Sequence, residues 1–417
     1  MKILAISHIF PPAIDGGSKV IYQLSHQLET QGHDVIYLSS DCTSTDDFTK
    51  TKFKKSKVQK IQHSKVIKIP VYHLLRRPLK FINLFIPKNF YFHQLLQVFQ
   101  KGPIFKIIPF IKTTFKIIKF KPNLIIAGPL PTTIILYATY FRNLINLINK
   151  KNGFCKLLIN SSFHQSDPDF SRMPLLKTLQ KADYLWTLTQ YETSFFVKKL
   201  KINPAKIILA GNGVDPDFPK TKKNKSTNSN LKSTILFVGS LASHKRVDLL
   251  IKSFFSLITN KLINQSTSKL IIVGQKTLFF PKIYKLFKSL PASIQKQIHF
   301  KFKVNNKDLI KIIDQCQFLV LPSIQESFGL VLIESWTRSK AVITSDIPPL
   351  KEIVTSSNGG LVFKTDDIND LQQKIEKLIS NPKLCRQLGQ NGQIYVKNNY
   401  TWAKVSQKIC QKILPSA

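Results

Sequence analysis

The chain has 417 residues, and its 62 Lys and Arg against 23 Asp and Glu give a formal net charge of +39 at pH 7. A hydrophobic fraction of 43% with 20% charged residues excludes an intrinsically disordered chain, and 15 Gly and 22 Pro without a short period exclude collagen-like and solenoid folds. The length predicts roughly two or three domains. The charge attracts nucleic acid, an anionic membrane or small anionic substrates, and does not choose among them.

The N-terminal part of the chain begins with a β-α-β pattern. Lys2–Ile9 reads as a buried strand, Ser18–Thr30 as a helix with Ser18 as its N-cap, and Asp34–Leu38 as a second strand. Further apolar runs predict strands at Asn123–Ala127, Lys156–Asn160, Tyr184–Leu188 and Lys206–Leu209. Alternating strands and helices indicate an α/β fold with a parallel sheet covered on both faces.

A polar, basic segment separates these strands and helices from a second series of alternating strands and helices. We expect residues 1–215 to form the first domain and residues 216–233, which are almost free of large apolar side chains, to be a linker or long exposed loop. The second α/β domain is expected over residues 234–397, and residues 398–417 should hold a last helix that packs back on the first domain. Its strands are expected at Thr234–Val238, Lys269–Val273, His299–Lys303, Phe318–Leu321 and Ala341–Thr344. Two doubly wound domains predict a ligand site in the cleft between them.

Three features bear on location and metal content. The first ten residues have one Lys and no small-residue cleavage site, so we expect no signal peptide. Gly128, Pro129 and Pro131 interrupt the longest uncharged apolar stretch, so we expect no transmembrane helix. The five cysteines form no CxxC pair, which is typical of a reducing cytosol and argues against a structural zinc site.

The most specific segment is PSIQESFGLVLIESWTR at residues 322–338. Glu326 follows a predicted strand at the entrance of a predicted helix, and Glu334 lies roughly two turns further on. Carboxylates accept hydrogen bonds from sugar hydroxyls, and free N–H groups of residues 327–330 at a helix start suit a diphosphate. The segment can therefore hold a nucleotide sugar. From the spacing alone, a helix with one glutamate in its capping region and one on its surface is the favoured interpretation.

The segment ESFGLVLIE resembles the E-x7-E signature of the family 4 retaining glycosyltransferases of GT-B fold. Further segments agree in order and spacing, and they are the N-terminal ISHIFPPAIDGGSKVIYQLSHQLETQGHDV, SSFH, GNGVD, VGSLASHKRVDLLI, SDIPPLKEIV and SNGGLVF. The resemblance covers nearly the whole chain and is weakest over residues 43–121. It implies a GT-B fold, in which two Rossmann-like doubly wound domains face each other across a cleft.

The resemblance implies roles for residues of the second domain. Glu326 would contact hydroxyls of the transferred sugar, Glu334 would contact the ribose, and Lys245 would lie on the donor diphosphate. Many members carry an Arg where this chain has Ser240, and Arg246 could replace that charge. The predicted donor-binding stretch at the helix entrance consists of Ser327, Phe328, Gly329 and Leu330.

In the first domain the resemblance points to a glycine loop and a histidine. Gly16 and Gly17 match the loop whose backbone approaches the diphosphate or the acceptor, where a Cβ would obstruct the approach. His164 follows a predicted strand and matches the histidine that the family places near the donor sugar. A GG pair alone is usually a turn, and a lone histidine is usually structural, so both roles depend on the resemblance.

The implied reaction moves a hexosyl unit from a nucleotide-diphosphate sugar to an acceptor hydroxyl with retention at the anomeric carbon. The family is thought to use a same-face displacement, so we name no protein nucleophile. A DxD sequence that could hold a divalent ion is absent, and we expect no metal and no cofactor beside the nucleotide sugar. The donor base, the sugar and the acceptor are not readable from these residues.

The charge is concentrated in the expected acceptor domain. Between Asp47 and Asp167 there is no Asp or Glu, while Lys, Arg and aromatic residues are frequent. Basic and apolar residues interleaved at helical spacing suit an anionic bilayer surface. We therefore expect a cytoplasmic protein, peripheral on the inner face of the plasma membrane, with a carbohydrate or lipid-linked acceptor in cell-envelope glycolipid or polysaccharide synthesis. A solvated basic surface with a soluble acceptor is the alternative.

Two other classes of protein remain open. A catalytically silent GT-B partner subunit is conceivable because Ser240 replaces the usual Arg. A basic nucleic-acid-binding protein would use the same charge, but no helix-turn-helix, zinc or RNP-like signature is present, and nucleic acid is not the expected partner.

Overall fold

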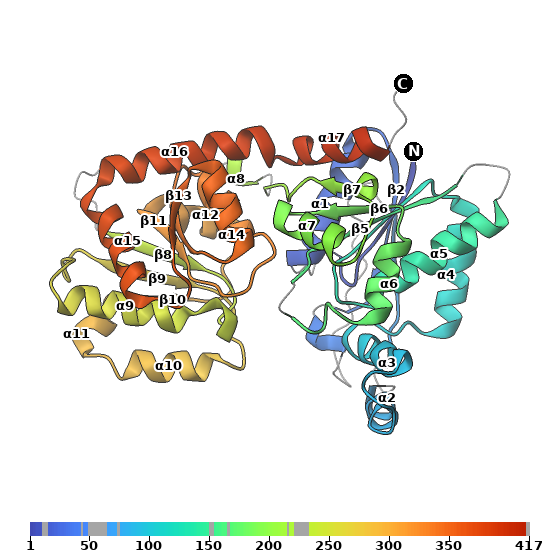
Figure 1. The fold of residues 1–417 in the computed structure, drawn as a ribbon, viewed down its shortest axis with the longest axis horizontal. Coiled ribbons are helices and arrows are strands. Elements are labelled where there is room, and N and C mark those ends of the chain that lie inside the picture. Colours follow the sequence, from blue (N-terminus) through green and yellow to red (C-terminus); the bar gives the residue numbers. More distant parts are fainter. Residues whose placement is uncertain are drawn as a thin grey trace. The chain divides into compact units, whose positions relative to one another are not determined.

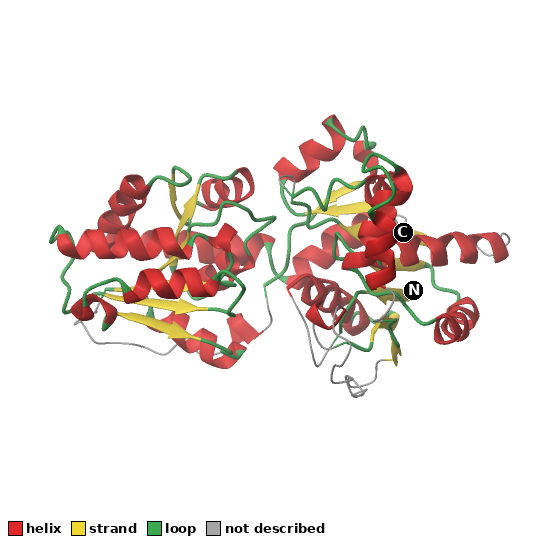
Figure 2. Cartoon of the chain, turned by 90° about the horizontal axis from the view of Figure 1, so that it is seen from below, coloured by secondary structure: helices red, strands yellow, loops and turns green. Residues whose placement is uncertain are grey.

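The structure is a computed structural model that describes residues 1–10, 16–42, 45–48, 65–72, 76–149, 154–164, 167–214, 217–220 and 233–413. The chain divides into two compact units. Unit 1 comprises Met1–Gly213 and Val405–Ala417, and unit 2 comprises Val214–Lys404. In each unit a sheet lies between layers of helices (Figures 1 and 2). The predicted α/β fold with two parallel sheets is confirmed.

The described residues of unit 1 form a seven-stranded sheet in the order β3-β2-β1-β4-β5-β6-β7, and every pair is parallel. The strands are β1 Lys2–Ile6, β2 Asp34–Ser40, β3 Lys65–Ile69, β4 Leu124–Ala127, β5 Lys156–Asn160, β6 Tyr184–Thr187 and β7 Ile207–Leu209. Most of them are near-continuous apolar runs, as is expected for strands buried on both faces. The helices are α1 Gly16–Thr30, α2 Arg76–Asn83, α3 Tyr91–Lys101, α4 Ile107–Phe120, α5 Ile134–Ile148, α6 Met173–Lys181 and α7 Gln190–Lys198.

The first helix corrects one prediction. It begins at Gly16, two residues before Ser18, so Ser18 is not the N-cap but lies inside the first turn. Ser18 is fully buried, and its hydroxyl accepts a hydrogen bond from Ser7 Oγ at 2.9 Å. Gly16 and Gly17, which the resemblance places in a loop, are the first two residues of this helix.

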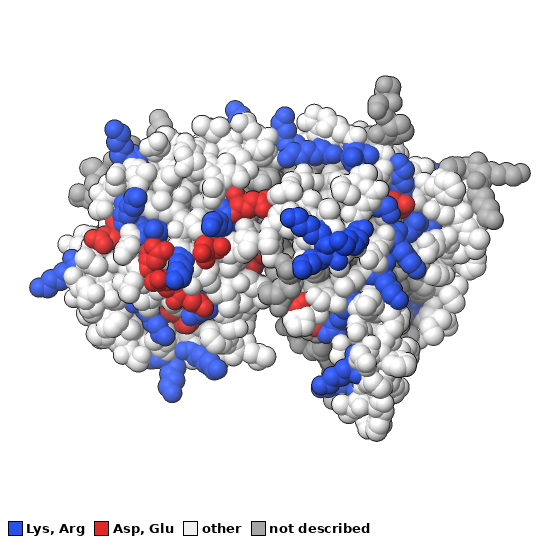
Figure 3. Space-filling model, in the orientation of Figure 1, with Lys and Arg blue, Asp and Glu red and all other residues white. Residues whose placement is uncertain are grey.

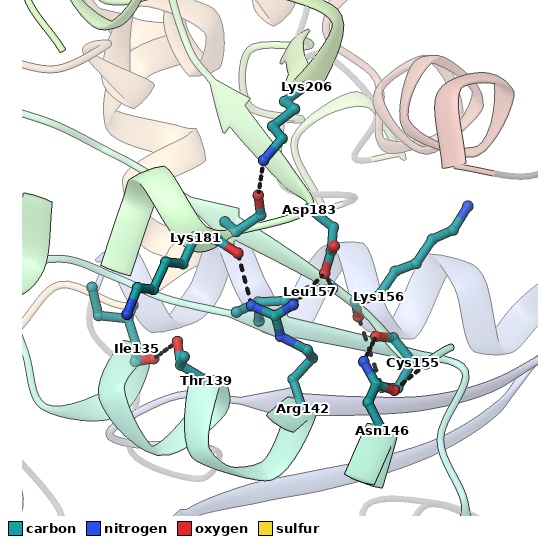
Figure 4. Close-up of polar contacts among 11 residues, drawn as sticks. Ile135, Thr139, Arg142, Asn146, Cys155, Lys156, Leu157, Lys181, Asp183 and Lys206 are labelled. Carbon is teal, nitrogen blue, oxygen red and sulfur yellow. Dashed lines mark hydrogen bonds and ion pairs between the residues drawn. The ribbon is translucent and has the colours of Figure 1, made fainter. Parts of the chain in front are cut away.

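Polar contacts join helices to strand starts in unit 1 (Figure 4). Arg142 of α5 donates to the Lys181 carbonyl at 2.7 Å, and its Nη1 lies 3.6 Å from Asp183 Oδ2. Asp183 in turn accepts from the Leu157 N–H at 2.8 Å. These contacts attach α5 to the strands that begin at residues 156 and 184.

The described residues of unit 2 form a six-stranded parallel sheet in the order β10-β9-β8-β11-β12-β13. The strands are β8 Thr234–Val238, β9 Lys269–Val273, β10 Ile298–Lys301, β11 Phe318–Leu321, β12 Ala341–Ser345 and β13 Gly360–Phe363. The helices are α8 Asp217–Lys220, α9 Val247–Thr259, α10 Phe280–Lys288, α11 Ala292–Gln295, α12 Asn306–Gln315, α13 Leu330–Thr337, α14 Pro348–Ser357, α15 Ile368–Ser380 and α16 Pro382–Asn399.

Part of the expected linker is folded. Residues 217–220 form α8, whose Phe218 is fully buried. Arg338 donates to the Phe218 carbonyl at 2.9 Å and forms a bidentate pair with Asp314, with both nitrogen–oxygen distances 2.7 Å. One large apolar residue and a buried guanidinium therefore attach this part of the segment to unit 2, while residues 221–232 lie outside the described residues.

The last helix, α17 Trp402–Ile413, contributes to unit 1 from Val405 onward. Its buried side chains are Trp402, Val405, Ser406, Ile409 and Ile413, at the spacing of one helical face. The Gln31 side chain donates to Ser406 Oγ at 3.3 Å, and Lys156 Nζ donates to the Ile413 carbonyl at 3.2 Å. Unit 2 extends to Lys404, beyond the expected boundary at residue 397.

Candidate active site

The candidate site of unit 2 lies where β8 and β11 end. The two strands are neighbours in the sheet, and residues 239–246 and 322–329 follow them. The Ile324 N–H donates to the His244 carbonyl at 2.8 Å and joins the two loops. Ligands of such sheets bind at the carboxyl ends of the strands, so this pair of loops is where a ligand is expected.

Lys245 and Glu326 face each other across these loops. Lys245 Nζ forms an ion pair with Glu326 Oε1, and the two side chains are 16% and 12% exposed. Ser323, which is fully buried, donates its hydroxyl hydrogen to the same oxygen at 3.1 Å. The structure thus brings together Glu326, which by the resemblance would bind the transferred sugar, and Lys245, which would bind the diphosphate.

Arg246 is held by carboxylates of its own unit. It has a left-handed backbone conformation with φ of 49°, between the turn Ser243–Lys245 and α9. Its Nε lies 3.4 Å from Asp248 Oδ1, and its Nη1 pairs with Asp366. A diphosphate would therefore have to compete with two carboxylates for this guanidinium, and the donor-binding role of Arg246 remains a prediction.

The start of α13 presents main-chain donors. Gly329 precedes the helix with φ of +79°, a conformation that favours glycine. Among the residues that the structure describes, the N–H groups of Ser327, Phe328, Gly329 and Leu330 have no acceptor. Glu334 lies in the second turn of α13 and is partly buried. The helix start can therefore receive an anionic group through the main chain.

Phe328 divides its roles between main chain and side chain. The side chain is 1% exposed and packs edge-on against Tyr400, with ring centroids 5.1 Å apart. The side chain of Phe328 belongs to the core of unit 2, so only its main chain, the group that the sequence prediction used, is available to a donor.

The two glycines of unit 1 differ in their surroundings. A Cβ on Gly17 would lie 2.6 Å from Pro129 Cγ, so close packing requires glycine there. A Cβ on Gly16 would meet no atom within 4 Å among the described residues. Gly17 therefore has a packing reason of its own, and the donor-binding role of Gly16 stays a prediction.

His164 follows β5, as predicted, and its ring lies edge-on to Phe170 with centroids 5.0 Å apart. The loop before it is held by Glu192, which is buried and accepts from the N–H groups of Phe163 at 2.7 Å and Leu188 at 2.6 Å. Sequence reasoning missed Glu192. The spacing of Thr189 and Glu192 is the signal that could have found it, because Thr-x-x-Glu is a capping box, and Thr189 does cap α7.

Within the described ranges, no group of three or more His, Cys, Asp or Glu side chains could hold a metal ion. The expectation that the reaction needs no metal stays a prediction.

A family model described as glycosyl transferases group 1 matches residues 198–395. An uncharacterized glycosyltransferase, MJ1178 of Methanocaldococcus jannaschii, is 28% identical over 249 residues, which are 56% of this chain and 66% of that protein. The O-antigen chain mannosyltransferase RfbU of Salmonella typhimurium is 26% identical over 213 residues, which are 51% of this chain and 56% of that protein. The chain thus spans less than two thirds of the length of these relatives.

Solved structures agree in fold over almost the whole chain. Sucrose-phosphate synthase from Thermosynechococcus elongatus has a TM-score of 0.69 at 18% identity and covers 98% of this chain, with 97% of its own chain covered. Anabaena HepE in complex with UDP and glucose has a TM-score of 0.68 at 13% identity, with 99% of each chain covered. The fold is that of the GT-B glycosyltransferases, and residues 198–395 are similar to the glycosyl transferases group 1 family.

Proposed function

We propose that this protein is a retaining glycosyltransferase that moves a hexosyl unit from a nucleotide-diphosphate sugar to an acceptor hydroxyl. The observation that carries the proposal is the ion pair of Lys245 and Glu326 at the ends of two adjacent strands, inside the segment that matches the family. Structures of similar fold are described as complexes with UDP and with UDP-glucose, which supports a nucleotide sugar as the donor.

Each group of the site has a chemical task in this proposal. Glu326 accepts hydrogen bonds from hydroxyls of the transferred sugar, and Glu334 accepts them from the ribose. The N–H groups of residues 327–330 and the Lys245 ammonium receive the diphosphate. By the resemblance, His164 would lie near the donor sugar, and the backbone of Gly16 and Gly17 would approach the diphosphate or the acceptor. Arg246 would add charge if it leaves Asp248 and Asp366.

Donor binding would replace the ion pair between Lys245 and Glu326 with contacts from each residue to the donor. In the structure, Lys245 and Glu326 neutralise each other. A bound donor gives Lys245 a phosphate oxygen and gives Glu326 a sugar hydroxyl, while Ser323 keeps the carboxylate in place. The ammonium then stabilises the negative charge that grows on the leaving diphosphate. A diphosphate is a weak base, so the reaction needs no strong general acid from the protein.

For the acceptor, we propose a carbohydrate or lipid-linked intermediate of cell-envelope glycolipid or polysaccharide synthesis. RfbU is named as an O-antigen chain mannosyltransferase, and the similarly folded WaaG is described as involved in lipopolysaccharide biosynthesis. We further propose a cytoplasmic location with peripheral contact to an anionic membrane.

A donor screen tests the proposal. The purified chain is incubated with a panel of nucleotide sugars, and mass spectrometry follows the release of nucleoside diphosphate. We expect release with one donor class, no dependence on added divalent metal, and loss of release in Glu326→Gln. The proposal is wrong if no donor is consumed with any acceptor extract. Tight, salt-sensitive DNA binding in that case would favour the nucleic-acid alternative.

A further inference from the structure

The helices α2 and α3 and the turn between them expose large apolar side chains. Leu84 and Phe85 are 75% and 74% exposed. We call the set the α2–α3 corner, and its members are Phe81, Leu84, Phe85, Phe90 and Phe92. In the view of Figure 3 the surface over α2 and α3 is mostly white, with blue atoms beside it. Large apolar side chains exposed together in one short segment are typical of an interaction site.

The corner has a fixed shape. The buried His93 lies 2.8 Å from the Ile86 carbonyl through Nδ1 and 2.9 Å from Gln97 Nε2 through its own Nε2. A neutral imidazole with its hydrogen on Nδ1 satisfies both contacts, since it donates to the carbonyl and accepts from the amide. The rings of Phe81 and Phe85 pack edge-on with centroids 5.1 Å apart. The turn is therefore tied to α3 from inside while its apolar side chains face outward.

The helix α4 adds a second amphipathic surface. Ile108, Ile111 and Phe115 are exposed, and at 3.6 residues per turn they lie along one stripe, opposite the buried Thr113, Thr114 and Ile117. A parallel stripe beside them consists of the exposed lysines Lys112, Lys116 and Lys119. Apolar side chains are thus flanked along one edge by ammonium groups.

The charge beside these apolar groups has one sign. Lys80 and Lys88 are exposed in the corner itself, and no acidic residue occurs between Asp47 and Asp167. A protein partner is a poor match, because protein interfaces are depleted in lysine. A nucleic acid would satisfy the lysines but leave Leu84 and Ile108 without an apolar partner. An anionic bilayer offers both phosphate and hydrocarbon.

We propose that the α2–α3 corner and the exposed stripes of α4 are a docking surface for an anionic lipid bilayer. The corner enters the boundary between headgroups and acyl chains, and the lysines of α4 extend to the phosphates. No helix among the described residues is long and apolar enough to span a bilayer, and the surface does not need one. The inference gives the proposed lipid-linked acceptor a membrane on which the enzyme meets it, and in that respect it rests on the proposed function.

Vesicle flotation of the full chain tests the surface, with phosphatidylcholine vesicles compared to vesicles that also contain phosphatidylglycerol. We expect stronger binding to the anionic vesicles. The double variant Leu84→Ser/Phe85→Ser should weaken binding at least about tenfold on those vesicles. Lys112→Gln/Lys116→Gln should weaken it about thirtyfold on the anionic vesicles and leave weak binding to the neutral ones unchanged.

Matched substitutions in unit 2 serve as controls. Leu278→Ser/Ile394→Ser removes two other exposed apolar side chains, and Lys261→Gln/Lys307→Gln removes two other exposed charges. Both should bind as the wild type does, and circular dichroism should show all variants folded. Equal losses in control and test variants would overturn the proposal. So would sedimentation showing that the corner holds two copies together, with vesicle binding absent.

The two proposals fail in different ways. If the membrane inference is wrong, the corner variants float like the wild type, whether or not nucleoside diphosphate is released. If the proposed reaction is wrong, no nucleotide sugar is consumed in solution, while flotation and its dependence on Leu84 and Phe85 persist.

Discussion

Lys245 and Glu326 lie 81 positions apart in the chain and form an ion pair in which both side chains are mostly buried. The pair exists because the loops after β8 and β11 are joined by the main-chain bond from Ile324 to His244. In the proposed donor complex the same ammonium would move from the carboxylate to the diphosphate, since both partners are anions.

Removal of either charge should abolish most of the turnover. In the proposed reaction, Lys245→Ala removes the cation that stabilises the leaving diphosphate, and Glu326→Gln removes the carboxylate that orients the sugar. Each should lower kcat by about 100-fold or more. Initial rates of nucleoside diphosphate release measure the effect. Lys252→Ala and Glu376→Gln, outside the site, should leave the rates unchanged, and a near-normal rate in Lys245→Ala would contradict the assignment.

The same pair should contribute to stability in a non-additive way. Lys245→Ala leaves the mostly buried Glu326 carboxylate with Ser323 as its hydrogen-bond donor, which should cost about 1–3 kcal/mol. The double variant Lys245→Ala/Glu326→Gln removes the unpaired charge and should recover part of that loss. Urea unfolding of the wild type, both single variants and the double variant provides the cycle. Strictly additive losses would show that the two charges do not interact.

Gly329→Ala should destabilise unit 2 more than an ordinary surface substitution does. The added Cβ would lie 2.9 Å from Leu350 Cδ2, and the alanine would have to adopt the φ of +79° that Gly329 has. We expect a loss of about 2 kcal/mol or more, from backbone strain together with the contact. Gly32→Ala is the matched control, because Gly32 has φ of +88° but no atom within 4 Å of the added Cβ. Equal shifts of Tm in the two variants would show that Leu350 gives way freely.

Asp346 should make stability depend on pH. The hydrogen bond from the Thr365 hydroxyl, at 2.6 Å, is the main cause that holds the pKa of this carboxyl below its ordinary value of 3.8. A lowered pKa in the folded state stabilises the fold above pH 3.8, and this stabilisation is lost as the pH falls through the folded-state pKa.

Thr365→Val removes that hydroxyl and should raise the pKa of Asp346. The variant should be less stable than the wild type at neutral pH, and the difference should shrink in acid. Urea unfolding across the pH range measures it, with the exposed Thr355→Val as the control. If the stability difference between the wild type and Thr365→Val grew as the pH fell, the assigned role of the Thr365 hydroxyl would be wrong.

Asn146→Ala should uncouple α5 from β5. The Asn146 side chain accepts from the Cys155 N–H at 2.7 Å and donates to the Cys155 carbonyl at 3.1 Å (Figure 4). Alanine leaves both main-chain groups without this partner, so we expect a loss of about 1–3 kcal/mol in urea unfolding. Asn143→Ala, on the exposed face of the same helix, should change stability little. A similar loss in both variants would point to helix propensity as the cause.

The strands were predictable where most of their side chains are buried. The predicted bounds of β5, β8, β9 and β11 are those of the structure, because buried strands of parallel sheets read as apolar runs between polar turns. The edge strand β3 was missed, since KVIKI places a lysine at its start and another in its interior. The β-strand propensity of these residues does not distinguish an edge strand with two lysines from a basic loop.

The residues of the candidate site were predictable from the sequence, but the contacts between their side chains were not. The resemblance placed Lys245 and Glu326 at strand ends, but their mutual pairing depends on how two loops pack. Likewise, no local pattern indicates that Arg246 meets Asp366, which lies 120 residues away. Glu192 did carry a local signal in its capping box.

Phe328 has its ring in the interior of unit 2 and its N–H beside the candidate donor site. A smaller residue there would loosen the contact with Tyr400 and shift the main chain that meets the phosphates. Both the ring contact with Tyr400 and the position of the main chain therefore limit which residues can replace Phe328. We therefore expect Phe328 to stay aromatic whichever sugar is used.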